Sequence, residues 1–407
     1  MSSSEQAYPK LRALDARPIS HNGQPSILLR DPLQLSERTI VIPQALSAAL
    51  VLFDGTRSAD AVSAALAVRY GLQVPSNTLQ RLVTALDEAL LLDNARFAQA
   101  HEAALSAYRQ APHRPLSSAG ESYPADADEL RQALQSYVEA LPGVVPVEGR
   151  VRGLVSPHID YARGGTVYAA VWKRASLSVR AADLVVVLGT DHYGQGNLLT
   201  LTRQHYATPY GLLPTAQGIV DELAEAIGPQ AAFAGELHHR GEHSIELAAV
   251  WLHHMRHGQP CDVVPVLCGS FQPFIEGEGT PQEDATLASF CQALRQATAG
   301  PRTLVVAAAD LSHVGPAFGG APLGLVERAR LQAADEELLT CMCAGDAQGF
   351  YGAIQRDGDR RNVCGLPPID LALRLLAPVS GEQVAYQRCP ADERGTSWVS
   401  VCGVVWE

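Results

Sequence analysis

The chain has 407 residues, of which 47% are hydrophobic and 18% are charged, and its formal net charge is −12. A chain of this length is expected to form two or three domains with sizeable cores. The negative charge argues against non-specific binding to nucleic acid or to an acidic membrane, because both require a basic surface.

Targeting and redox signals favour an intracellular protein. The first ten residues, MSSSEQAYPK, lack the apolar core of a secretory signal. No apolar run reaches the ~18 residues that a membrane-spanning helix needs. The eight cysteines lie between Cys261 and Cys402 without a CxxC pair. This pattern predicts reduced thiols, so we expect a cytoplasmic protein that neither spans nor binds a membrane.

The first 110 residues are expected to form one small domain. Residues 26–43 predict two short strands around a turn, and residues 44–94 contain three short helical patterns. Thr56 or Ser58 caps the second helix and Gly71 ends it. This order predicts a winged-helix-like module, and LFDGTRSADAVSAAL resembles the peptide-chaperone domains called PqqD-like. The domain then binds a peptide or, as an equal alternative, serves only for packing.

A stretch rich in Pro, Ser and Ala follows at 111–129, and we place a linker at 111–118 and a second domain at 119–407. The strand candidates of this second domain consist of nearly continuous Val, Leu and Ala, which is typical of a mostly parallel sheet with helices on both faces. We therefore expect an α/β fold. The strand candidates are 151–156, 183–190, 261–269, 302–310 and 397–405; the helix candidates are 217–227, 244–257, 284–298, 323–343 and 368–377.

Three of the expected strands lead into a histidine that lies close to an acidic residue. The pairs are His158 with Asp160, His192 with Asp191, and His313 with Asp310. In open α/β sheets, ligands bind outside the carboxyl ends of the strands. One such histidine is more often an ordinary turn residue, but three at equivalent positions predict a common site.

Two further segments are expected to join this site. RGEHSIEL, residues 240–247, carries Glu242 and His243 where a helix begins, and Cys364 lies in a Gly/Pro-rich turn before another helix. Imidazole and thiolate together suit zinc, iron or copper rather than magnesium or calcium. The neighbouring acids are suited to orient the histidines or to act as general bases.

Other patterns carry less weight. His253 and His257 are four residues apart in WLHHMRHG, but the acid of a zinc-protease helix is missing, so we interpret this segment as a solvated helix face. His238 and His239 are interpreted as loop residues, and the charged helix at 323–343 as a surface helix. The chain has no P-loop, GxGxxG or GxSxG motif, so neither a nucleotide site nor an α/β-hydrolase is supported.

The second domain resembles the Memo family, whose bacterial members are called AmmeMemoRadiSam system protein B. The matching segments, which occur in the family's order over about 117–407, are AGESYPADADELRQAL, SPHIDYARGG, LGTDHYG, YATPYG, GEHSIELAAVWL, VVPVLCG, AADLSHVG and NVCGLPPI. The resemblance implies a fold similar to class III extradiol ring-cleaving dioxygenases, which hold non-haem Fe(II) with two histidines and a glutamate.

Carried over position by position, the resemblance implies that His158, His192 and Cys364 bind a transition metal. It places three catalytic residues beside the metal: Asp310, His313 and His243. The residues expected around the substrate cleft are Asp160, Tyr161, Asp191, Tyr193 and Glu242. Many relatives have Ala-Gly where this chain has Ile159-Asp160, so the cleft gains a polar group in this chain.

The function implied is that of a metal-dependent redox protein, an oxidoreductase of the dioxygenase type with iron or copper and with zinc as a substitute. A cysteine in place of the glutamate ligand donates more charge and favours Cu(I) or thiolate-bound iron. The alternative is a non-enzymatic copper- or iron-binding protein, or a scaffold for a partner. The system name implies a radical-SAM protein as that partner, in addition to the peptide expected at the N-terminal domain.

Overall fold

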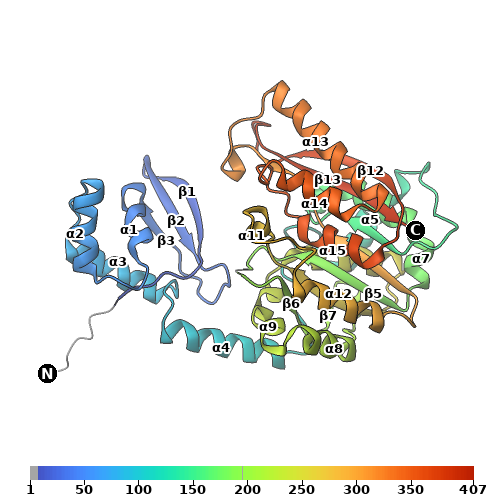
Figure 1. Ribbon diagram of the computed structural model, residues 1–407, viewed down its shortest axis with the longest axis horizontal. Helices are drawn as coiled ribbons and strands as arrows, with labels where there is room; N and C mark the ends of the chain where they lie inside the picture. The colour runs from blue at the N-terminus through green and yellow to red at the C-terminus, as the bar shows by residue number, and fades with distance from the viewer. Residues whose placement is uncertain (1–7, 195) are drawn as a thin grey trace. The chain divides into compact units, whose positions relative to one another are not determined.

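The computed structural model describes residues 8–194 and 196–407, and the chain divides into two compact units, Met1–Gln110 and Ala111–Glu407 (Figure 1). Each unit has its own apolar core. In the part of the chain that the structure describes, none of the helices combines the length and the apolar character needed to cross a bilayer.

The first unit is a three-stranded antiparallel sheet followed by helices. The strands are β1 (Asp15–His21), β2 (Gln24–Arg30) and β3 (Ile40–Pro43), paired in the order β1-β2-β3. The helices are η1 (Gln44–Leu46), α1 (Ser47–Leu52), α2 (Ala59–Tyr70), α3 (Ser76–Glu88) and α4 (Ala95–Gln110). The expected strands and helices are present, whereas β1 and α4 are additional elements. Apolar side chains of β2, β3, α1, α2 and α3 form one core around Leu29, Phe53, Leu66 and Leu86.

Local signals set the limits of α2. The Ser58 side chain accepts a hydrogen bond from the backbone N–H of Ala61 and caps the start of the helix. Gly71 ends the helix with φ = 67°, a left-handed conformation that glycine adopts at little cost. In α3, Leu79, Leu82 and Leu86 are buried at helical spacing, as their periodicity predicts.

We expect residues 1–110 to fold without the rest of the chain, because the core of this unit is built from its own side chains. A fragment ending at Gln110 should unfold cooperatively in urea when followed by circular dichroism. A fragment that is disordered while the full chain is folded would contradict this prediction. Titration of the folded fragment with leader-like peptides tests whether it also binds a partner.

The second unit contains an eight-stranded mixed sheet in the order β11-β13-β4-β10-β5-β9-β6, with β12 paired to β13. Its four inner strands β4, β10, β5 and β9 are parallel, and each outer strand pairs antiparallel with its neighbour. The α/β fold is thus confirmed, although the strand expected at 397–405 runs antiparallel. The strands are β4 (Gly153–Ser156), β5 (Leu184–Thr190), β6 (Leu199–Leu201), β9 (Asp262–Cys268), β10 (Thr303–Ala308), β11 (His313–Val314), β12 (Gly381–Pro390) and β13 (Trp398–Trp406); β7 (Tyr206–Thr208) and β8 (Gly211–Leu213) form a separate hairpin.

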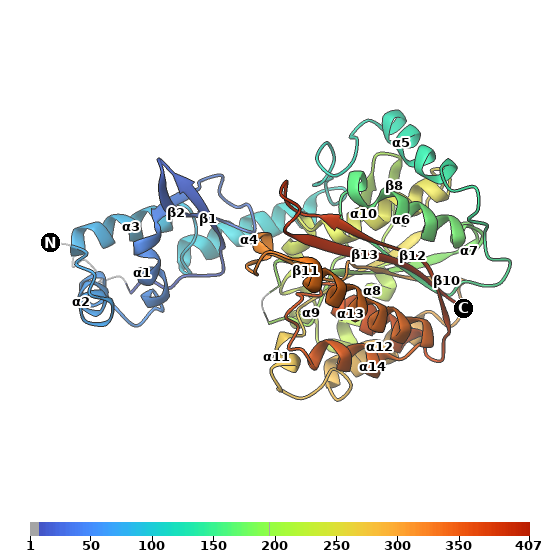
Figure 2. The ribbon, with the colours of Figure 1, turned by 90° about the horizontal axis from the view of Figure 1, so that it is seen from above.

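Helices cover both faces of this sheet (Figure 2). One face carries α5 (Ala127–Glu139), α6 (Tyr161–Arg174), α7 (Ser176–Ala181) and α10 (His243–Met255). The other carries α8 (Gln217–Ile227), α12 (Ala285–Ala297), α13 (Leu325–Ala344), α14 (Ala347–Gln355) and α15 (Leu366–Leu376). Short helices α9 (Pro229–Phe233), η2 (Glu236–Arg240), α11 (Gln272–Ile275) and η3 (Pro316–Phe318) complete the unit. In β5, Val185 and Val187 enter one core and Val186 and Leu188 the other, which explains its unbroken apolar run.

Residues 111–118, expected as a linker, are packed into the second unit through Arg114. The fully buried guanidinium of Arg114 binds the carboxylate of Glu246 and donates to the backbone oxygens of His239 and Glu242. The backbone N–H groups of Ser117 and Ser118 donate to the same carboxylate at 2.9 Å. This segment therefore anchors the start of α10.

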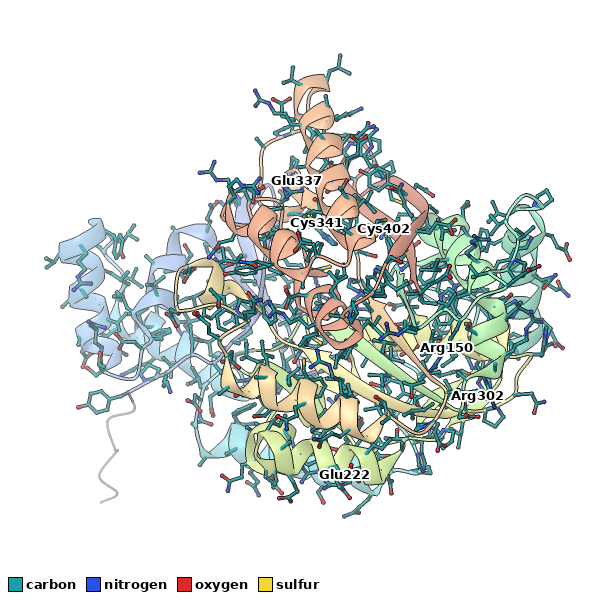
Figure 3. All side chains as sticks on the ribbon, turned by 45° about the vertical axis from the view of Figure 1, so that its right-hand side comes forward. Arg150, Glu222, Arg302, Glu337, Cys341 and Cys402 are labelled. Carbon is teal, nitrogen blue, oxygen red and sulfur yellow. The ribbon has the colours of Figure 1, made fainter. Side chains whose placement is uncertain are left out.

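The register of the parallel strands separates the two ends of the sheet. Arg150 and Arg302 each lie three residues before the register pair Gly153–Val305 of β4 and β10, and they lie close together at the amino end (Figure 3). The residues that follow β4, β10 and β5 must accordingly meet at the opposite, carboxyl end. The candidate site lies at that end.

Candidate metal centre

His158, Asp310 and His192 each lie two residues beyond the end of a parallel strand. The strand β10 lies between β4 and β5, so the three carboxyl ends are neighbours. The rings of His158 and His192 are consequently close, with centroids 5.1 Å apart. The strand order therefore brings these strand ends together, as the sequence predicts.

The backbone and a carboxylate fix the ring of His158. Its side chain is buried, with Nδ1 3.0 Å from the carbonyl oxygen of Ala308. Because a carbonyl only accepts, Nδ1 carries a proton, and Nε2 is the nitrogen left for a metal, which would displace any proton on it. The backbone N–H of His158 donates to Asp310 Oδ1 at 2.8 Å, which holds the turn after β4 against the turn after β10. His158 is thus set in the tautomer that binds a metal through Nε2.

Glu242 orients two further imidazoles. It is the N-cap of α10 and is fully buried. Its carboxylate lies 3.0 Å from His192 Nδ1 and 3.2 Å from His243 Nδ1, and it accepts the backbone N–H groups of His192 and Ser244. The positive end of the helix dipole favours this charge. Glu242 therefore orients both imidazole rings through their Nδ1 atoms. The sequence had placed Glu242 in the lining of the substrate cleft.

Cys364 reaches the same point from the turn before α15. Its Sγ lies 3.3 Å from His158 Nε2, and its carbonyl oxygen accepts the hydroxyl of Thr190 at the end of β5. The next residue must be glycine, because a Cβ on Gly365 would lie 2.3 Å from the carbonyl oxygen of Asp310. This close approach of two backbones brings the thiol to the histidines.

The donor atoms of His158, His192 and Cys364 all lie within 4.8 Å of one another. Two imidazole nitrogens and one thiolate suit zinc, iron or copper, and each histidine has its other nitrogen tied to a buried acceptor. His192, Glu242 and His243 also group within 4.8 Å. In that second group the carboxylate is already occupied by four N–H donors, so the first group fits a metal better.

The electrostatics of the cluster favour the thiolate. Burial raises the pKa of Cys364, but the charges of His158 and His313 and hydrogen bonds from His158 and His192 outweigh it and hold the pKa well below its usual range. Burial lowers the pKa of His158, whereas the charges of Asp310 and Cys364 raise it to about 9. The thiolate is the form of cysteine that binds metals.

The expected catalytic residues Asp310 and His313 lie beside this cluster. Asp310 is buried, with Oδ2 3.8 Å from His158 Nε2. Burial lowers the pKa of His313, but the charges of Cys364 and Asp310 raise it overall. The third residue, His243, stacks on His192 with ring centroids 4.9 Å apart. All three are close enough to the candidate ligands to exchange protons with groups bound there.

The loop that carries His313 is held by residues that the sequence did not single out. The buried carboxylate of Asp335 accepts hydrogen bonds from the hydroxyls of Ser312 and Tyr386 and lies 3.3 Å from Arg361. The carbonyl oxygen of Arg361 accepts the backbone N–H of His313 at 2.6 Å. Asp335 belongs to α13, which was expected to be a surface helix, and only the position of its neighbours in space reveals its role.

The other expected cleft residues occupy different surroundings. Tyr161 is part of the core beneath α6, with its hydroxyl donating to the carbonyl oxygen of Leu247. Asp160 caps α6 and pairs with Arg163 at 2.6 Å. Asp191 is buried and binds His238 and the backbone N–H of Tyr193. The contacts of Asp160, Asp191 and Tyr161 are thus structural, and Tyr193 is half-buried beside Gly241.

Two histidines interpreted as solvated or loop residues are buried, so those interpretations were wrong. His253 is 1% exposed and lies 2.7 Å from the hydroxyl of Thr208. His239 is fully buried in η2 against the hydroxyl of Tyr206. Both contact the hairpin β7–β8, whose position over α10 and η2 is set by distant parts of the chain.

Comparison of the sequence with known proteins assigns the chain to a family. The model of the family described as Memo-like protein matches residues 114–403. A MEMO1 family protein of Aquifex aeolicus is 26% identical over 98% of this chain and 99% of its own length. MEMO1 family proteins of Thermus thermophilus and Methanosarcina acetivorans are 29% and 28% identical over 78% and 66% of this chain, and over 90% and 88% of their own lengths. The Aquifex match extends through the N-terminal unit, whereas the family model begins at Arg114. The chain therefore belongs to the Memo-like family.

Proposed function

We propose that this chain is a transition-metal redox protein whose iron or copper ion is bound by His158, His192 and Cys364. The observation that carries the proposal is the convergence of these donor atoms within 4.8 Å, from three separate loops. The buried acceptors Ala308 and Glu242 fix the ring tautomers that a metal requires. When bound, such an ion supplies a Lewis acid and a redox centre.

Between the two roles that remain open, we favour an oxidoreductase of the dioxygenase type. A site that only stores a metal needs ligands, whereas this site also has Asp310 and His313 at its edge, an acid and an imidazole suited to hold and move protons. The alternative is a non-enzymatic copper- or iron-binding protein or a scaffold for a radical-SAM partner. The thiolate ligand supports that alternative, because it is soft and easily oxidised.

Oxygen uptake separates the two roles. The purified, metal-loaded chain should consume O2 with catechol as a probe substrate if it is an oxidoreductase of this type. Stoichiometric metal by elemental analysis without O2 uptake would favour the metal-binding role. Absence of bound metal from protein loaded with Fe(II), Cu(I) or Zn(II) would contradict both the redox role and the metal-binding role.

Asp310→Asn and His313→Ala are expected to retain most of the metal and to lose turnover. Neither side chain belongs to the proposed ligand set, and both lie beside it. General acid–base residues typically contribute about 100- to 10,000-fold to a rate. Elemental analysis and O2 uptake measure the two properties separately.

A matched control is Asp183→Asn, which removes an exposed carboxylate that pairs with Arg302 at the amino end of the sheet. This variant should resemble the wild type in both assays. Complete metal loss in both Asp310→Asn and His313→Ala would make these residues metal ligands and would overturn the proton-transfer roles proposed for them.

A further inference from the structure

A row of aromatic side chains runs from the proposed metal centre into the core between α6 and α10. The hydroxyl of Tyr168 in α6 donates at 2.9 Å to the carbonyl oxygen of Ile159, the residue that follows His158. The ring of Tyr168 stacks on that of Trp251 in α10, with centroids 5.7 Å apart and an angle of 8° between the rings. Both side chains are fully buried. The row therefore starts one residue from a proposed metal ligand.

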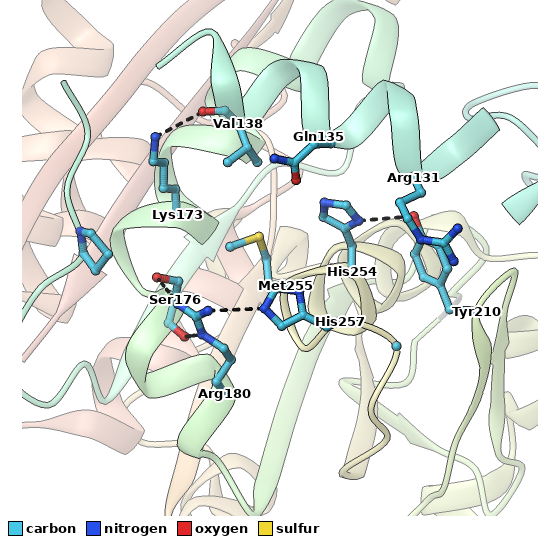
Figure 4. Close-up of a pocket in the computed structure, with 12 residues that line it drawn as sticks. Arg131, Gln135, Val138, Lys173, Ser176, Arg180, Tyr210, His254, Met255 and His257 are labelled. Atoms are coloured by element: carbon cyan, nitrogen blue, oxygen red, sulfur yellow. Dashed lines mark hydrogen bonds between the residues drawn. The ribbon is translucent and has the colours of Figure 1, made fainter. Parts of the chain in front are cut away.

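The other end of this row lies at a cavity of about 440 Å³ beside the end of α10 (Figure 4). The ring centroid of His254 lies 5.8 Å from that of Trp251 and 5.9 Å from that of Tyr210. The phenol oxygen of Tyr210 lies 3.3 Å from His254 Nδ1. Tyr210 and His254 are half-buried and both line the cavity. A continuous series of ring contacts thus joins the surroundings of His158 to a place that small molecules can reach.

The indole N–H of Trp251 is unusual, because no described residue accepts a hydrogen bond from it. Buried tryptophans usually pair this group, since an unpaired donor in the interior is costly. Packing alone therefore does not explain why a tryptophan occupies this position. The missing acceptor has a chemical consequence: an oxidised indole keeps its proton where no base can take it. Trp251 can accordingly lose and regain an electron without moving a proton.

Tyr210, in contrast, has a base beside its phenol. Burial lowers the pKa of His254, and the charges of His257 and Arg131 lower it further, to about 4, so this imidazole is uncharged at neutral pH. An oxidised phenol is a strong acid, and even a weakly basic imidazole takes its proton. The guanidinium of Arg131 lies 5.5 Å from the centroid of the Tyr210 ring and opposes a positive charge on it, which favours this proton loss. An oxidising equivalent that reached Tyr210 would be held there as a neutral radical.

A second branch of the aromatic row ends inside the protein. The ring centroid of Tyr161 lies 5.0 Å from that of Tyr168 and 5.5 Å from that of Tyr123. Tyr123 donates to the carboxylate of Glu246, but its side chain is only 4% exposed. A reductant in solution cannot reach this end. Tyr210 is therefore the end of the row that can exchange electrons with another molecule.

The proposed ligand set gives such a path a use. A cysteine ligand binds as the thiolate, and peroxides oxidise thiolates to sulfenic acid and then irreversibly to sulfinic acid. A metal centre that a peroxide oxidises in the absence of substrate would draw its missing electrons from the nearest oxidisable group, which is Cys364. An electron supplied from elsewhere in the chain would spare this ligand.

We infer that Trp251 and Tyr210 form an electron path that reduces the metal centre when a peroxide oxidises it without substrate. This inference rests on the proposed metal site. One electron passes from Trp251, through the ring of Tyr168, to the oxidised centre. Tyr210 then gives one electron to Trp251 and its phenol proton to His254 Nδ1.

The electrons and protons of this sequence balance. A one-electron reductant of the ascorbate class enters the cavity and returns an electron and a proton to the Tyr210 radical. His254 releases the proton that it received to water. Two such passages supply two electrons and two protons, which convert one molecule of hydrogen peroxide into two of water.

Electron paramagnetic resonance of the full-length protein, loaded with Fe(II) and frozen rapidly after mixing with hydrogen peroxide, tests this inference. The wild type should show a tyrosine radical, with a spectrum that narrows when tyrosine is ring-deuterated and that disappears when ascorbate is added. Tyr210→Phe should lose this signal, and Trp251→Phe should lose most of it. Mass spectrometry should find sulfinic acid at Cys364 sooner in both variants than in the wild type when ascorbate is present.

The matched controls are Tyr351→Phe and Trp406→Phe, which change buried rings in the core on the other face of the sheet. The Tyr351 hydroxyl and the Trp406 indole each donate to a backbone carbonyl oxygen, and neither ring belongs to the aromatic row. Both controls should form the radical as the wild type does. Tyr210 is half-buried at the cavity, so Tyr210→Phe keeps the test valid if Trp251→Phe does not fold.

Iron content, measured by elemental analysis of each sample, separates the two levels of the account. Absence of iron from the wild type would overturn the electron path together with the proposed iron site. Full iron content without a tyrosine radical would overturn the electron path alone. The same holds for a radical that survives Tyr210→Phe, for one that is unchanged in folded Trp251→Phe, and for an equal loss in the two controls.

Discussion

Replacing Arg114 by Ala is expected to lower the free energy of unfolding by about 3–5 kcal/mol. The side chains of Arg114 and Glu246 are both fully buried, so the substitution would leave a carboxylate in the interior without its cation. Donors from Ser117, Ser118 and Tyr123 remain, but they do not neutralise the charge. Equilibrium unfolding in urea, with transitions of the two units resolved, measures the change.

The matched control for this prediction is Arg302→Ala, which breaks an ion pair whose side chains are 67% and 48% exposed. Such pairs contribute about 0–1 kcal/mol, so the control should unfold nearly as the wild type does. A similar loss in both variants would show that burial of the Arg114–Glu246 pair is not what makes it important.

The same pair predicts a dependence of stability on pH. Burial raises the pKa of Glu246, but the charge of Arg114 and the hydrogen bonds from Tyr123 and Ser117 lower the pKa below its ordinary value overall. A carboxyl group whose pKa is lower in the folded state stabilises that state above its unfolded pKa. This stabilisation should be lost as the pH falls through the lowered pKa, and should be absent from Arg114→Ala.

Cys364→Ser and His192→Ala are expected to weaken Cu(I) binding by more than about 100-fold. Loss of a residue that only orients a ligand typically costs about 10- to 100-fold, so loss of a ligand should cost more. Cys364→Ser removes the one soft donor of the set and should affect Cu(I) more than a harder ion. Competition with a chelator of known affinity gives the dissociation constants.

Two variants bracket this prediction. Cys341→Ser changes a partly exposed cysteine on α13 that is not in the cluster, and it should bind copper as the wild type does. Glu242→Gln keeps all three donors and weakens the anchor of His192, so its affinity should fall between the two extremes. Loss of binding in Cys341→Ser with full binding in Cys364→Ser would place the metal elsewhere.

The strands and their ends could be predicted from the sequence for a definite physical reason. The strands β5 and β10 are covered on both faces, so nearly every residue in them is apolar and the run ends sharply where the chain leaves the core. Polar residues just after such runs, His192 and Asp310, therefore mark the carboxyl edge of the sheet. Cys364 was expected at the site from its Gly/Pro-rich turn, but its role as a metal ligand came from the family resemblance, since a lone cysteine in a turn has no periodic signal.

The contacts that organise the site could not be predicted from the sequence in this way. The bond from His158 to Asp310 joins residues 152 positions apart, and His192 meets Glu242 across 50 positions. Local periodicity carries no information on such pairs. It also misplaced Asp335 and His253, because their charged or polar neighbours in sequence indicated a surface while distant segments bury them.

X-ray absorption spectroscopy of the metal in the full-length protein tests the central claim most directly. A centre held by His158, His192 and Cys364 should show scattering from one sulfur and from two imidazole rings. The sulfur contribution should disappear in Cys364→Ser and persist in Cys341→Ser. A wild-type spectrum with only nitrogen and oxygen neighbours, or a sulfur contribution that survives Cys364→Ser, would contradict the proposed metal centre.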